Sequence, residues 1–196
     1  MYKRQEELRA ELRDLSIYKV LTLASAYRHT GKTDVTTLTK LTLRTLARRA
    51  VALEEEVKEI DRLLKTLVAE TAPELNAIDG VGTDVASALL VAAGDNPERL
   101  KNEATFAKLC GVSPLDASSG KQHRHRLNRG GDRQANSALW HIVFTRMVND
   151  PRTKYYIERR MKEGRTKKEA MRCLKRYVAR EVFAQLPRSA FALDNP

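Results

Sequence analysis

Two adjacent serines near the middle of the chain are followed by a glycine and a group of cations. Ser118 and Ser119 precede Gly120. The basic residues that follow are Lys121, Arg124, Arg126 and Arg129. A serine hydroxyl attacks phosphorus only with help from a base or a metal site, and the phosphoryl transition state needs cations beside it. The pattern is compatible with attack on a phosphodiester, but spacing alone favours a loop that binds phosphate without chemistry.

The same region contains a second possible nucleophile. His123 and Arg126 form an HxxR pair, and Tyr155 and Tyr156 follow about thirty residues later, an order that tyrosine recombinases share. The run HRHR makes such a pair easy to obtain by chance, and no upstream arginine stands in the helical context that this mechanism needs. The four histidines lack metal-ligand spacing with cysteines or carboxylates. The sequence therefore predicts no metal site in this chain.

The basic charge is concentrated in one part of the sequence. The 196 residues include 36 Lys and Arg against 25 Asp and Glu, a net charge of +11. Residues 121–180 alone hold 18 basic and 5 acidic residues, a local net charge of +13. Such a field attracts polyanions, because neutralising phosphates releases counterions. DNA or structured RNA is therefore the expected partner, and a solvated basic surface is the alternative.

The sequence contains no segment typical of secretion or membrane insertion. No run of about 18 apolar residues occurs, and Met1 is soon followed by Lys3, Arg4 and further charged residues. The two cysteines, Cys110 and Cys173, lie far apart without a CxxC partner, which is typical of a reducing compartment. We expect a cytoplasmic protein with no membrane partner.

Helical patterns cover the first third of the chain. Residues 2–14 and 16–28 predict short helices, and a long helical pattern starts at Asp34. Apolar or small residues then recur at alternating steps of three and four: Leu43, Leu46, Ala50, Leu53, Val57, Ile60, Leu64 and Leu67. This heptad seam predicts a coiled-coil arm that pairs two subunits. The alternative is an amphipathic helix packed on its own domain.

Two glycines after the arm form a second candidate phosphate contact. Pro73 ends the arm, and Gly80 and Gly82 then precede an apolar helix that starts near Thr83. This pattern resembles a helix-hairpin-helix motif, in which a tight turn presents backbone N–H groups to a DNA phosphate. A plain connection between helices is the alternative.

Capping signals predict further helices in the rest of the chain. Asn96 and Asn102 are expected to cap two short segments, and Gly111 to end the second. Asp132 and Asp150 precede the next two helices, and Thr166 with Glu169 forms a capping box for the last. No alternating strand pattern is convincing, so the fold is predicted to be all-α. The predicted parts are helices and arm over 1–72, a helical domain over 73–187 and a tail over 188–196.

Four motifs occur together in this order: GVG at 80–82, GVSP at 111–114, SSG at 118–120 and NRGGDRQAN at 128–136. With the surrounding residues, roughly 70–185, they resemble the C-terminal transposase domain of the IS110 (IS116/IS110/IS902) family. The arm is similar to the coiled coil of that family. The resemblance implies a DNA transposase whose serine forms a phosphoserine link with DNA, and it assigns that role to Ser119, with Ser118 as the alternative.

The resemblance also implies partners and a missing half of the active site. The family uses an N-terminal RuvC-like domain whose acidic tetrad binds a divalent metal, and a bridge RNA that selects DNA. No RuvC-like pattern is present here, so we expect a truncated or split copy that needs Mg²⁺ only with that domain supplied in trans. A non-catalytic, dimerising regulator is the alternative function. The expected DNA contacts are Gly80, Gly82, Thr83, Lys121, Arg124, Arg126, Arg129 and Arg133. The expected partners are DNA, a guide RNA and a second copy of the chain, and the expected location is the prokaryotic cytoplasm, in association with the nucleoid.

Overall fold

The computed structural model describes residues 2–28, 31, 33–94, 100–116, 125–126 and 128–187. Within these residues the fold is all-α, as predicted, apart from one pair of two-residue strands. Contacts divide the chain into two compact units, and the division falls between Arg62 and Leu63, inside the longest helix. No described helix combines the length and the apolar character needed to cross a membrane.

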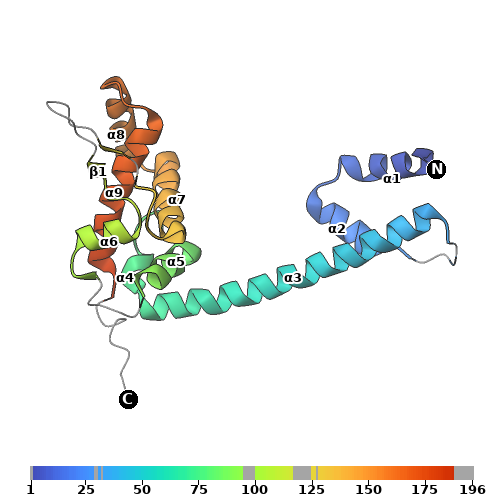
Figure 1. Cartoon of the computed structure of the whole chain (residues 1–196). Helices are drawn as coiled ribbons and strands as arrows, with labels where there is room; N and C mark the ends of the chain where they lie inside the picture. The colour runs from blue at the N-terminus through green and yellow to red at the C-terminus, as the bar shows by residue number, and fades with distance from the viewer. Residues whose placement is uncertain are drawn as a thin grey trace, which may run out of the picture. The chain divides into compact units, whose positions relative to one another are not determined.

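The first unit consists of two short helices and most of a long one (Figure 1). Its elements are α1 (Tyr2–Arg13), α2 (Ile17–Ser25) and the first part of α3 (Val35–Thr71). Asp34 starts α3 as predicted, because its side chain accepts a hydrogen bond from the Thr37 N–H at 2.7 Å. Leu8, Ala24 and Ala47 are buried in this unit.

The second unit is a helical domain that starts with the end of α3. It continues with α4 (Pro73–Asn76), α5 (Thr83–Ala93), α6 (Glu103–Leu109), α7 (Arg133–Asn149), α8 (Pro151–Lys162) and α9 (Lys167–Gln185). Helix α7 packs against α5, α8 and α9, and α9 also contacts α6 (Figure 1). The largest fully buried side chains are Phe106, Leu75, Leu89, Leu139, Ile142, Val143, Val182 and Cys110.

Side-chain caps place the helix starts of this domain where the sequence predicts them. Asn102 accepts from the Thr105 N–H, Asp132 from the Ala135 N–H and Asp150 from the Thr153 N–H. Thr166 and Glu169 form the predicted capping box of α9. Asn96, the other predicted cap, lies outside the described residues.

The strand pair is a local exception to the helical prediction. Strand β1 (Leu115–Asp116) pairs antiparallel with β2 (His125–Arg126), so Leu115 lies opposite Arg126. Two residues per strand are too few to produce a readable alternation. The pair joins the two ends of the segment 117–124, which contains Ser118 and Ser119 in the sequence.

Candidate nucleic-acid interface

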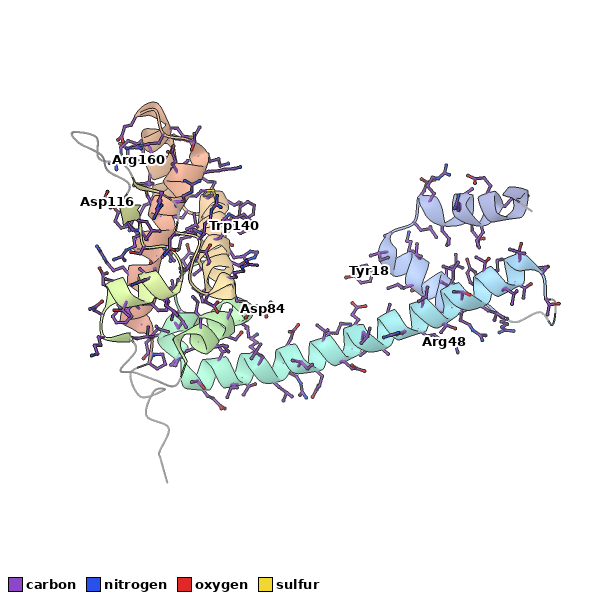
Figure 2. The ribbon with its side chains drawn as sticks, in the orientation of Figure 1. Tyr18, Arg48, Asp84, Asp116, Trp140 and Arg160 are labelled. Carbon is purple, nitrogen blue, oxygen red and sulfur yellow. The ribbon has the colours of Figure 1, made fainter. Side chains whose placement is uncertain are left out.

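A basic pocket of about 780 Å³ lies in the helical domain. One side is formed by residues 111–114, which follow α6, and by Arg126 of β2. The other side comes from α8, α9 and the connection between them. Its cations are Arg126, Arg160, Arg165, Arg172, Lys175, Arg176 and Arg180. Figure 2 labels Arg160 of α8 and Asp116 of β1 in this domain.

Carboxylates neutralise part of this charge. Glu103 of α6 pairs with Arg176 at 3.1 Å and Arg180 at 2.5 Å. The hydrogen bond from Arg180 is the main reason why the pKa of Glu103 is lowered. Glu163 pairs with Arg160 at 2.5 Å.

The remaining cations of the pocket keep an excess of positive charge. Glu169 is the acidic residue among the lining side chains, and its carboxylate is bonded to the backbone N–H of Thr166 at 2.8 Å. The Nε of Arg160 and one Nη of Arg176 are buried without a hydrogen-bond partner among the described residues. A concave site with several arginines and unmet donors fits a phosphate group, because guanidinium groups bind phosphate oxygens in pairs.

Lys175 differs from the other cations of the pocket. Its Nζ donates to Oδ1 of Asn136 on α7 at 2.7 Å. Burial, and then the positive charge of Arg172, lower the pKa of Lys175. Its hydrogen-bond partner is a neutral amide, so the ammonium keeps its charge for an incoming anion.

The backbone just before the loop 112–129 lies against the backbone just after it. Gly111 has a φ of +64°, and a Cβ there would lie 2.4 Å from the Gly130 carbonyl oxygen. A Cβ on Gly131 would lie 2.5 Å from the Leu109 carbonyl oxygen. The Asp132 N–H donates to that same oxygen at 2.6 Å. The backbone contact therefore requires glycine at both positions and fixes the two ends of the loop.

The predicted helix-hairpin-helix turn contains two glycines with different surroundings. Gly80 has a φ of +80°, and a Cβ there would lie 3.2 Å from the Ile142 carbonyl oxygen of α7. Arg146 holds the same turn, because its Nε donates to the Asp79 carbonyl oxygen at 2.8 Å. Gly82 has ordinary backbone angles and open space around it. Gly80 is thus required for packing, whereas Gly82 leaves room for a ligand.

A second hollow, of about 430 Å³, lies beside this turn. It is lined by Gly80, Gly82, Asp84, His141 and Thr145, with Val81 and Val85. Asp84 contributes a negative charge to it. The hollow is therefore less suited to a phosphate than the basic pocket.

Comparison with known proteins agrees with the motifs. Residues 72–158 match the model of the transposase IS116/IS110/IS902 family. The chain belongs to this family. It is also similar to the uncharacterized 43.6 kDa protein of insertion element IS110 from Streptomyces coelicolor, with 30% identity over 149 residues. The match covers 74% of this chain and 36% of that relative, so the chain spans about a third of the relative's length.

The structure describes about half of the predicted site residues of this IS110-family chain. Arg126 lines the basic pocket, and Arg129 and Arg133 are exposed. Gly80 and Gly82 lie in the turn before α5, and Thr83 is the first residue of that helix. The remaining predicted residues, Ser118, Ser119, Lys121 and Arg124, lie outside the described residues.

The cations of α8 and α9 are the part of the pocket that the sequence prediction missed. Arg172, Arg176 and Arg180 recur every four residues, which places them on one helical face. This spacing is the sequence signal that could have indicated a cationic site, but the solvent-exposed face of an ordinary helix has the same spacing. The pocket exists only where α8, α9, residues 111–114 and Arg126 come together in the fold.

Proposed function

We propose that this chain acts in DNA transposition, with the basic pocket as the site that binds the phosphate backbone of DNA. The observation that carries this proposal is the position of the pocket: Arg126 of β2 and residues 113–114, which lead into β1, line it. The segment with the serine pair therefore leaves and rejoins the domain at the edge of a cationic site.

The chemistry proposed for this site is attack by Ser119, or by Ser118, on a DNA phosphodiester. The serine oxygen forms a bond to phosphorus, the bond from phosphorus to the leaving DNA oxygen breaks, and the serine proton passes to a base. The departing hydroxyl takes up a proton. Cations beside the phosphorus stabilise the added negative charge of the transition state.

The described part of this chain offers no cluster of donors for a divalent ion. Among the described residues, no group of three or more His, Cys, Asp or Glu side chains is arranged to hold a metal. We therefore derive no step through a metal on this chain. An acidic, RuvC-like domain in trans is the proposed source of any Mg²⁺.

Trapping the covalent intermediate tests this proposal. The chain would be incubated with an IS110-family RuvC-like domain, Mg²⁺ and DNA, and denaturing gels would be examined for a protein–DNA adduct. We expect the adduct with the wild type and with Ser118→Ala, and none with Ser119→Ala. If only Ser118→Ala loses the adduct, the nucleophile is Ser118 and not Ser119. Loss in Tyr155→Phe or Tyr156→Phe, with both serine variants active, would overturn the serine mechanism.

Self-association through α3 is a second part of the proposal. Five residues of the heptad seam are exposed: Leu46, Leu53, Val57, Ile60 and Leu67. A row of exposed apolar side chains on one helix is typical of a seam that a partner helix covers. Without catalysis, the same pairing would give a dimeric nucleic-acid-binding regulator. Guide RNA is a further proposed partner, attracted by the same excess of positive charge.

A further inference from the structure

The basic pocket and the base of the loop meet at one side chain, that of Asn136 on α7. Its Oδ1 accepts from the Lys175 ammonium at 2.7 Å. Its Nδ2 donates to the Cys110 carbonyl oxygen at 2.8 Å. The second bond lies next to Gly111, where the chain enters the loop. Both polar atoms of this amide are therefore bonded: the oxygen to the lysine of the pocket, and the nitrogen to the backbone next to the start of the loop.

We propose that Asn136 is a positioning residue for the DNA site, which holds the Lys175 ammonium for a DNA phosphate and ties it to the Cys110 backbone, next to the start of the loop. The inference rests on the proposed binding of DNA in the basic pocket. A single planar amide sets the distance between the phosphate-binding lysine and the start of the loop.

The surroundings of Lys175 support a role in binding rather than in packing. A carboxylate partner would have neutralised a lysine whose function was to join two helices, whereas Asn136 leaves its charge intact. Besides Lys175, the charged groups that line the pocket are Arg126 on β2, Arg160 on α8, Arg165 before α9, and Arg172, Arg176, Arg180 and Glu169 on α9. The other titratable side chains of the lining are Cys173 and Tyr177, also on α9. Six of these seven charged groups are cations, so an anion is the ligand that their field favours.

A role for Lys175 in binding predicts a pH dependence of DNA affinity that the arginines would not produce. An arginine stays charged at all accessible pH values, whereas a lysine loses its charge when the pH rises through its pKa. Burial lowers the pKa of Lys175 below its ordinary value of 10.5. The ammonium binds phosphate, so affinity for DNA should fall as the pH rises toward that lowered pKa.

The test compares variants in a binding assay with a fluorescein-labelled 30-base-pair DNA at constant ionic strength between pH 7 and 10. Lys175→Ala should lose about tenfold in affinity at pH 7, the size of one lost charged phosphate contact. Lys154→Ala is the matched control, since it removes the same charge from an exposed position on α8. It should lose much less.

Two further variants separate positioning from general stability. Lys175→Arg should bind at pH 7 but lose the alkaline decline of the wild type. Asn136→Asp gives the lysine a carboxylate partner, so affinity at pH 7 should fall and the decline should move to higher pH. A purely structural Asn136 would change the melting temperature and leave the shape of the pH profile unchanged.

The results also distinguish this inference from the proposed function. Identical pH profiles for the wild type, Lys175→Arg and Asn136→Asp would overturn the inference, and so would equal losses in Lys175→Ala and Lys154→Ala. DNA binding in the pocket is tested independently by alanines at Arg165 and Arg172. If those alanines weaken binding but the Lys175 variants behave like the control, the pocket stands and only the inference fails.

Discussion

Helix α3 and the helical domain differ in what covers their apolar residues. In the domain, side chains such as Phe106 and Leu139 are fully buried by neighbouring helices. Along α3, the seam residues Leu53 and Ile60 remain 48% and 61% exposed. Both regions have apolar residues at helical spacing, so the periodicity alone does not say whether the same chain or another chain covers them.

Some residues of the seam are covered within the chain. Leu43 and Ala50 are half-buried, and Leu64 packs on the core of the domain together with the buried Val68. Packing within the chain therefore accounts for these turns of the helix. Pairing of the exposed turns remains a prediction.

The largest difference is expected between core and seam truncations. Phe106→Ala should lower the free energy of unfolding by about 3–5 kcal/mol, because it removes a fully buried ring that lies 6.0 Å from the Phe183 ring. Leu53→Ala should change the unfolding of the monomer by less than about 0.5 kcal/mol. Urea denaturation at low protein concentration measures both. Equal losses would mean that the seam is covered within the chain.

Substitutions at the two glycines of the turn 79–82 should have different effects, because Gly80 is needed for packing and Gly82 leaves room for a ligand. Gly80→Ala should cost about 1–3 kcal/mol in stability, because it combines a left-handed φ with a close contact to Ile142. Gly82→Ala has open space around the new methyl group and should leave stability unchanged. Thermal unfolding measures the first effect and DNA binding the second. A Gly82→Ala variant with wild-type affinity would remove this turn from the DNA contacts.

A charge in the seam should break self-association without unfolding the domain. Ile60→Asp places a carboxylate in the proposed interface, which should weaken association at least tenfold. Ala52→Asp introduces the same charge at an exposed α3 position outside the seam and is the matched control. Analytical ultracentrifugation reports the mass. A wild-type monomer at high concentration would contradict pairing through α3.

The two cysteines should report on the domain core and on the pocket separately. Burial raises the pKa of the Cys110 thiol to about 12, whereas Cys173 is half-buried and lines the basic pocket. Iodoacetamide at pH 8 should modify Cys173 at least tenfold faster than Cys110. Bound DNA should slow the modification of Cys173. Fast labelling of Cys110 would contradict its burial.

The raised pKa also sets a pH dependence of stability. The unfolded thiol loses its proton near its ordinary pKa of 9.0, and the folded thiol only near 12. Below pH 9 the group has no effect, and between about pH 9 and 12 stability should fall by up to about 1.4 kcal/mol per pH unit. Urea denaturation of the wild type and Cys110→Ala at pH 8 and pH 10 measures the difference in slope.

Local signals carried most of the sequence-based fold prediction. A cap or capping box needs only residues three positions apart, so Asp132 and Thr166 could be recognised from the sequence as helix starts. The pocket needs tertiary structure, because Arg126 and Lys175 are 49 positions apart and meet only through the packing of α9. Asn136 was part of a recognised motif, but its bonds to Cys110 and Lys175 join three separate segments.

The most direct test of the central claim is the salt dependence of DNA binding by the double variant Arg165→Ala/Arg172→Ala. If the basic pocket binds the DNA backbone, the variant should bind more weakly, and the slope of log affinity against log salt should decrease by about two. The exposed pair Lys19→Ala/Arg49→Ala, in the first unit, removes the same charge and should keep the wild-type slope. Equal slopes for the pocket variant and the wild type would contradict DNA binding in this pocket.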